Sequence, residues 1–90
     1  MKDWNFITNH GLVLLFISQK PESTTREIAD TLRVTERTVH RILSDLEADG
    51  YIKRTRTGRA NIYEINNHLA LKNNLTRKSA VKDLISLIGD

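Results

Sequence analysis

The feature that most constrains the fold of this sequence is a pair of helix signatures separated by three residues. Thr24 is a suitable N-cap for the first helix, because Glu27 three residues later completes a capping box. Thr35 is a suitable N-cap for the second. The apolar residues of that second helix keep the spacing i, i+3, i+4, i+7: Val39, Ile42, Leu43 and Leu46. Two helices joined by so short a turn, the second with a free polar face, form the helix-turn-helix pattern.

The sequence period changes from 3.6 to 2 after the second of these helices. The helical pattern runs from Glu36 to about Asp49, and Gly50 tolerates the left-handed conformation that ends many helices. Residues 51–65 are then rich in β-branched and aromatic residues on both sides of a turn at 56–59, which predicts a β-hairpin.

The predicted hairpin has an approximate inward side and a basic tip. Ile62 and Ile65 mark the inward side, although their spacing breaks strict alternation. Arg54, Arg56 and Arg59 are expected to point into solvent at the tip. An alternative role for Arg54 and Arg56 is to keep an edge strand from aggregating.

One helix is expected before this unit and one after it. Thr8 can cap a helix that ends before Pro21, and its run from Leu12 to Ile17 is apolar on nearly every side, so it must be buried on two sides. A last helix is expected over about 74–89. The fold class is therefore mainly α with a small β-hairpin wing: a winged helix-turn-helix with an additional C-terminal helix.

Length and composition limit what such a chain can be. Ninety residues allow a single domain, 1–90, with its core over 8–65. The chain contains no cysteine, which removes disulfides, a thiolate nucleophile and cysteine zinc sites. The longest apolar run is far below the roughly 20 residues of a membrane span, and no secretory signal is recognisable. We therefore expect a cytoplasmic protein.

The sequence contains no pattern typical of an enzyme. The three histidines, His10, His40 and His68, have no metal-ligand spacing in the absence of cysteine. There is no glycine-rich phosphate loop and no serine, histidine and aspartate set. We expect no catalytic site, no metal and no cofactor, and nothing indicates a small-molecule effector. A signal would enter through a dimer interface, a small pocket near the first helix or a change in concentration.

Positive charge gathers at the hairpin. The formal net charge of the chain is +3, and residues 51–65 carry four basic residues against Glu64 alone. Residues 25–50 carry four arginines against six acidic residues. A local basic patch suggests a polyanionic partner, and a merely solvated face is the alternative explanation.

The sequence over residues 24–65 resembles winged-helix transcriptional regulators of the MarR-like and related prokaryotic classes. The similarity lies in R-E-I-A-D-T-L over 26–32, in T-E-R-T-V-H-R-I-L-S-D-L-E-A-D-G over 35–50 and in Y-I-K-R over 51–54. The resemblance implies a sequence-specific regulator that binds double-stranded DNA, with the helix 36–49 in the major groove and the wing 51–65 on the backbone or minor groove. One departure is Arg33, which stands where the family's turn usually has a glycine in the left-handed conformation.

Helical geometry indicates which side chains would contact DNA. At 100° per residue, Arg37, Arg41 and Ser44 face away from Val39, and His40 lies on the flank. Arginine can donate two hydrogen bonds to guanine, whereas short hydroxyls suit phosphates. The alternative to a DNA contact is that Arg37 or Arg41 forms an ion pair with Asp45 on the same helix. For Glu36 a role in starting the helix is favoured over a base contact. The expected DNA-contacting set is Thr25, Arg26, Thr35, Glu36, Arg37, Thr38, His40, Arg41, Ser44, Arg54, Arg56 and Arg59.

The surplus of apolar residues in the first and last helices implies a partner surface. A second copy is the default partner, because most soluble oligomers are two-fold dimers. The expected dimerisation residues are Leu12, Leu15, Phe16, Val81, Leu84, Ile85 and Ile88. A dimer on DNA would be associated with the nucleoid. The alternatives are a protein-interaction module, which often lacks arginines on the second helix and wing, and an RNA-binding module.

Overall fold

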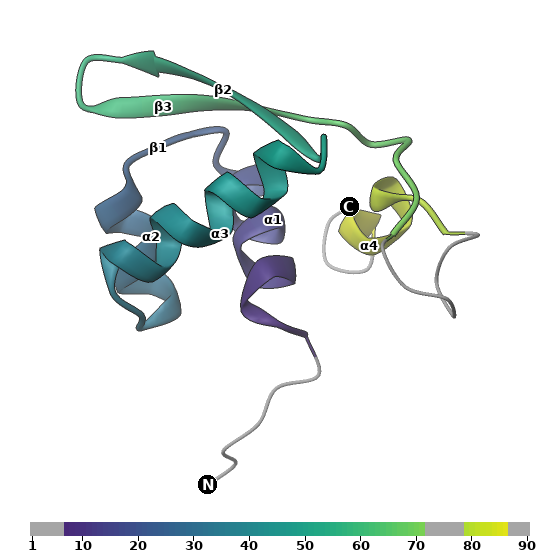
Figure 1. The fold of residues 1–90 in the computed structure, drawn as a ribbon, viewed down its shortest axis with the longest axis horizontal. Coiled ribbons are helices and arrows are strands. Elements are labelled where there is room, and N and C mark those ends of the chain that lie inside the picture. The colour runs from purple at the N-terminus through teal and green to yellow at the C-terminus, as the bar shows by residue number, and fades with distance from the viewer. Residues whose placement is uncertain (1–6, 72–78, 87–90) are drawn as a thin grey trace, which may run out of the picture.

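The computed structural model describes residues 7–71 and 79–86, which form a small bundle of helices covered on one side by a sheet (Figure 1). The elements of these parts of the chain are, in order, α1 (Asn9–Gln19), β1 (Glu22–Ser23), α2 (Thr25–Leu32), α3 (Glu36–Ala48), β2 (Ile52–Thr57), β3 (Ala60–Ile65) and α4 (Val81–Ser86). The order of helices and strands is that of a winged helix-turn-helix with a further helix after the wing.

The three expected N-caps are all confirmed. The hydroxyl of Thr8 accepts a hydrogen bond from the Gly11 amide, and the hydroxyl of Thr35 accepts one from the Thr38 amide. Thr24 and Glu27 form the complete capping box at the start of α2, with the Thr24 amide donating to Glu27 Oε1 over 2.8 Å. These bonds satisfy amides that have no partner inside the helix, and so fix where each helix begins.

The turn between α2 and α3 has the left-handed conformation expected of it. Arg33 adopts φ 58° and ψ 46°, and among the described non-glycine residues it alone has positive φ. Its amide donates to the carbonyl of Ala29, as does that of Val34. Gly50, at φ 82°, ends the next helix as predicted.

The wing is part of a three-stranded antiparallel sheet in the order β1-β3-β2. The two-residue strand β1 was not predicted: Glu22 pairs with Ile62, and Ser23 pairs with Asn61. Strand β2 continues to Thr57, which pairs with Ala60, so the expected four-residue turn contains only Gly58 and Arg59. Gly58 supplies the positive φ that so tight a hairpin loop requires.

The expected inward side of the hairpin is wrong at one position. Ile62 is 40% exposed, whereas its neighbour Tyr63 is 4% exposed and belongs to the core. Since side chains alternate along a strand, Tyr63 and the half-buried Ile65 share the face that packs on the helices, and Ile62 lies on the opposite face.

The core lies between the helices and the sheet. In Figure 1, α3 crosses in front of α1, and the hairpin extends above both helices. Each of α1, α2 and α3 contributes side chains to one cluster, to which Tyr51, Ile52 and Tyr63 add the base of the wing. The four predicted apolar residues of α3 are all buried. No described helix is long and apolar enough to cross a membrane.

The segment after the wing packs back onto the same core. Ala70 and Ala80 form an isolated antiparallel β-bridge, so within the described residues the last helix begins at Val81 and residues 79–80 are not helical. The expected start near 74, its end near 89 and Ile88 lie outside the described residues. α4 packs against α1, and the Tyr51 hydroxyl donates to the Ala70 carbonyl over 2.9 Å.

Candidate nucleic-acid interface

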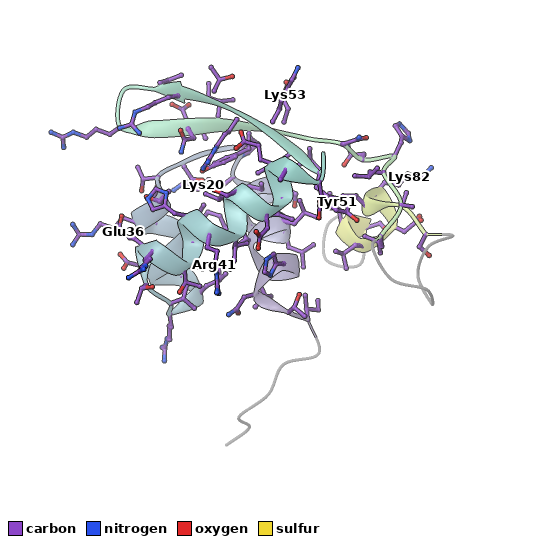
Figure 2. The ribbon with its side chains drawn as sticks, viewed as in Figure 1. Lys20, Glu36, Arg41, Tyr51, Lys53 and Lys82 are labelled. Carbon is purple, nitrogen blue, oxygen red and sulfur yellow. The ribbon has the colours of Figure 1, made fainter. Side chains whose placement is uncertain are left out.

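One face of α3 is turned to solvent and carries the predicted polar side chains. Arg37, His40, Arg41 and Ser44 are exposed, while Val39 on the opposite side is fully buried. Figure 2 shows Glu36 at the start of the helix and Arg41 further along it. The orientation derived from the spacing of the apolar residues is therefore confirmed.

The two arginines on this face have no protein partner within the described residues. The alternative to a DNA contact was an ion pair of Arg37 or Arg41 with Asp45. Asp45 instead accepts a hydrogen bond from His10 of α1, with 2.8 Å between Nε2 and Oδ2. No side chain in the described ranges occupies the five N–H donors of either guanidinium group.

The acidic residues of α3 are all engaged, although the surrounding segment has an excess of them. Glu36 Oε1 accepts from the Thr25 hydroxyl over 3.2 Å. Glu47 pairs with Arg54 Nε over 3.2 Å, and Asp45 is held by His10. Of these three contacts, only that of Glu47 with Arg54 pairs a carboxylate with a permanent positive charge, and the hydrogen bond to Glu36 leaves its negative charge in place.

The threonines near the start of α3 bond mainly to their own helix or to its neighbour. Thr35 Oγ1 accepts from the Thr38 amide and lies 3.0 Å from Thr38 Oγ1, to which it donates. Glu36 is the acidic residue in the first turn of α3, which agrees with the favoured role in starting the helix. The Thr25 hydroxyl also donates to its carboxylate and connects α2 to α3, a contact that was not predicted. Arg26 is exposed on the first turn of α2.

The wing arginines do not form one group. Arg54 was expected in solvent at the tip, but it is half-buried and bound to Glu47, because β2 runs beside the end of α3 at that point. Arg56 and Arg59 are exposed, and Arg59 follows Gly58 in the two-residue hairpin loop that these two residues form. The exposed basic groups of the wing are thus concentrated near its tip.

The arrangement of these elements brings the wing tip and α3 to one side of the molecule. In Figure 1 the hairpin loop and the N-terminal end of α3 both lie toward the left, and α4 lies toward the right. We use the name α3–wing face for the exposed arginines of these two elements, Arg37 and Arg41 on α3 and Arg56 and Arg59 on the wing.

The expected dimerisation residues occupy two kinds of position. Leu15 and Val81 are inside the chain, with exposed fractions of 5% and 0%, so they offer no surface to a second copy in this arrangement. The others that the structure describes are half-buried: Leu12, Phe16, Leu84 and Ile85. The one exposed large hydrophobic residue in the described parts is Ile62.

Sequence reasoning missed the residues on other elements that contact Asp45 and Glu47 of α3. His10 was considered only as a possible metal ligand, and Arg54 was assigned to solvent. Each contact joins residues on different elements, and His10 and Asp45 are 35 positions apart. No local spacing signals such a pair. Among the described residues, no cluster of histidine and acidic side chains is suitable for a metal ion.

Comparison with known proteins identifies the family. The model of the MarR family matches residues 5–60, which is more than half of the sequence. The chain belongs to the MarR family. The resemblance seen in the sequence is thereby confirmed, and this family of transcription regulators is not a family of enzymes. No curated protein sequence matches this MarR-family chain.

Solved structures support the same fold. One that matches is MepR, a transcription regulator of the Staphylococcus aureus multidrug efflux pump MepA, with a TM-score of 0.61 and 22% sequence identity. The alignment covers 92% of this MarR-family chain and 58% of the MepR chain. The likeness confirms the winged helix-turn-helix fold. It also shows that the present sequence spans little more than half the length of that protein.

Proposed function

We propose that this MarR-family chain binds double-stranded DNA through the α3–wing face and regulates transcription by occupying a promoter. The observation that carries the proposal is the pair of exposed arginines on the solvent face of α3, Arg37 and Arg41, which have no partner among residues 7–71 and 79–86. The nearby acids Asp45 and Glu47 contact other residues. An exposed helix face of this kind fits the major groove, and arginine donating to guanine O6 and N7 is the commonest specific contact there.

The wing would hold the duplex rather than select its sequence. Arg56 and Arg59 are exposed near the hairpin tip, where they suit phosphates or the minor groove. Contacts to phosphate fix orientation and carry no direct sequence information. Arg54, whose guanidinium is bound to Glu47, supports the junction between wing and helix instead.

A two-fold dimer is part of the proposal. A dimer places two recognition helices about 34 Å apart, so the operator would be an inverted repeat with half-sites roughly 10 base pairs centre to centre. The half-buried Leu12, Phe16, Leu84 and Ile85 would supply apolar contact on α1 and α4. The proposal places the protein in the cytoplasm, on the nucleoid.

The test is selection of bound fragments from a pool of random duplexes. Enrichment of an inverted repeat is expected, and a pool that stays random would contradict specific binding. Lys82→Ala is the matched control, because Lys82 is exposed on α4, on the other side of the molecule from the hairpin tip (Figure 2). This variant should select the same sequence as the parent.

The same experiment distinguishes the two other functions that the fold permits. Stronger binding to RNA than to duplex DNA of the same sequence would favour an RNA-binding module. Failure to bind either nucleic acid would favour a protein-interaction module. The exposed arginines on α3 and at the wing tip favour a nucleic acid over a protein partner, and competition between duplex DNA and RNA distinguishes the two nucleic acids.

A further inference from the structure

Asp45 lies close to the proposed base-contacting arginine along α3. Four residues separate it from Arg41, so the two side chains project about 40° apart and one turn apart on the same helix. Opposite charges at this spacing form ion pairs on helix surfaces. An unrestrained Asp45 would therefore compete with DNA for the Arg41 guanidinium, and its charge would repel the phosphates.

The structure keeps Asp45 from Arg41 by a contact with another helix. Asp45 Oδ2 accepts a hydrogen bond of 2.8 Å from His10 Nε2, in the first turn of α1. A carboxylate can only accept, so Nε2 carries the hydrogen in this bond whatever the charge on the ring. The capping bond of Thr8 and the packing of α1 against α3 fix the position of His10.

We infer that His10 is a positioning residue for DNA recognition. It holds the Asp45 carboxylate toward α1 and so leaves Arg41 available to the major groove. The inference rests on the proposed function, since it concerns the arginine expected to contact bases. The His10 and Asp45 side chains are 44% and 55% exposed, so the contact lies at the surface, where a substitution leaves the core intact.

The inference predicts opposite effects for the two partners of one hydrogen bond. His10→Ala releases the carboxylate and should weaken binding to the selected duplex about two- to five-fold, the scale of surface charge pairs. Asp45→Ala removes the carboxylate itself and should leave the affinity unchanged or raise it. The double variant should behave as Asp45→Ala does, because without the carboxylate His10 has nothing to restrain.

A purely structural contact between α1 and α3 predicts a different pattern. Each single variant would then weaken binding alike, since each breaks the same bond, and Asp45→Ala would not rescue His10→Ala. That pattern would overturn the inference, as would a His10→Ala variant that binds as the parent does. His10→Gln, which keeps an N–H donor at a similar distance from the backbone on a more flexible side chain, should recover part of the affinity lost in His10→Ala.

Two controls separate this inference from the proposed function. Circular dichroism and urea unfolding of each variant establish that it is folded. If His10→Ala does not fold, Asp45→Ala alone shows whether the carboxylate lowers or raises the affinity for DNA. A parent protein that binds no duplex would contradict the proposed function and the inference together. A parent that binds, with equal losses in both single variants, would contradict the inference alone.

Discussion

Ser23 and Arg33 flank α2, and each carries an energetic cost inside an otherwise well-satisfied structure. The Ser23 hydroxyl is buried without a hydrogen-bond partner in the described part of the chain. Arg33 holds a side chain in the left-handed region that glycine occupies freely. At each position, the local structure predicts how a substitution changes the free energy of unfolding.

Ser23→Ala should raise the free energy of unfolding by about 1 kcal/mol, because it removes a buried polar group that has lost its water and gained no partner. Urea unfolding at neutral pH measures the difference. A variant less stable than the parent would show that the hydroxyl makes a favourable interaction in solution.

Arg33→Gly should also raise the free energy of unfolding, by up to about 1 kcal/mol, since φ 58° is strained for a residue with a Cβ atom. Arg33→Ala is the matched control: it removes the same guanidinium but keeps the Cβ, so it should bring no such gain. Equal stabilities of the glycine and alanine variants in urea would contradict the strain argument.

At the scale of helices and strands, local features were predictable and long-range ones were not. The caps Thr8, Thr24 and Thr35 depend on residues three positions away, so the sequence indicates where three helices begin. Strand β1 and the pairing of Arg54 with Glu47 depend on segments that meet only in the folded chain. Because Arg54 is bound to Glu47, the wing tip has two exposed arginines, Arg56 and Arg59, where three were predicted.

The start of α2 should weaken in acid. Lys20 hydrogen-bonds to Glu27 and, with the Thr24 amide, holds the pKa of the Glu27 carboxyl below its usual value of 4.5. A lowered pKa in the folded state stabilises the fold at pH values above 4.5, and this contribution is lost as pH falls through the lowered value.

Glu27→Gln tests this contribution, because glutamine keeps the hydrogen bonds of the capping box but does not titrate. The parent should be more stable than the variant at pH 7, and the difference should disappear as the pH falls well below 4.5. Urea unfolding across this pH range measures it. A difference that stays constant with pH would contradict the assignment.

The wing tip should act on all duplexes alike. Arg59→Ala is expected to weaken selected and random duplexes by a similar factor. It should also reduce the slope of log affinity against log salt by about 0.9, since one phosphate contact releases one condensed counterion. Lys82→Ala provides the control for the loss of one positive charge. An unchanged slope in Arg59→Ala would place the wing away from the DNA.

At the scale of the whole molecule, α4 packs against α1 within one chain. Val81 is fully buried, and Leu84 and Ile85 pack against the same core. Among the residues of α1 and α4 that the structure describes, the outer parts of half-buried side chains remain available to a second copy. A dimer would therefore extend this packing across a two-fold axis and would not replace it.

Sedimentation of the parent should show a dimer at micromolar concentration. Replacing Leu84 and Ile88 with glutamate should give monomers that bind DNA far more weakly, because two half-sites can no longer be bound together. Circular dichroism must show that helix content is kept, since Leu84 also contacts its own core. A parent that stays monomeric at high micromolar concentration would leave the tail only its intramolecular role.

The central claim is that the solvent face of α3 recognises base pairs, and titration of Arg37→Ala and Arg41→Ala against the selected duplex tests it most directly. Each variant should lose about 1–3 kcal/mol of binding free energy on that duplex and relax the preference at one base position. Binding to random duplex should fall far less, and Lys82→Ala should bind the selected duplex nearly as the parent does. If both arginine variants bind selected and random duplexes as the parent does, the assignment of the α3–wing face as the DNA-reading surface is wrong.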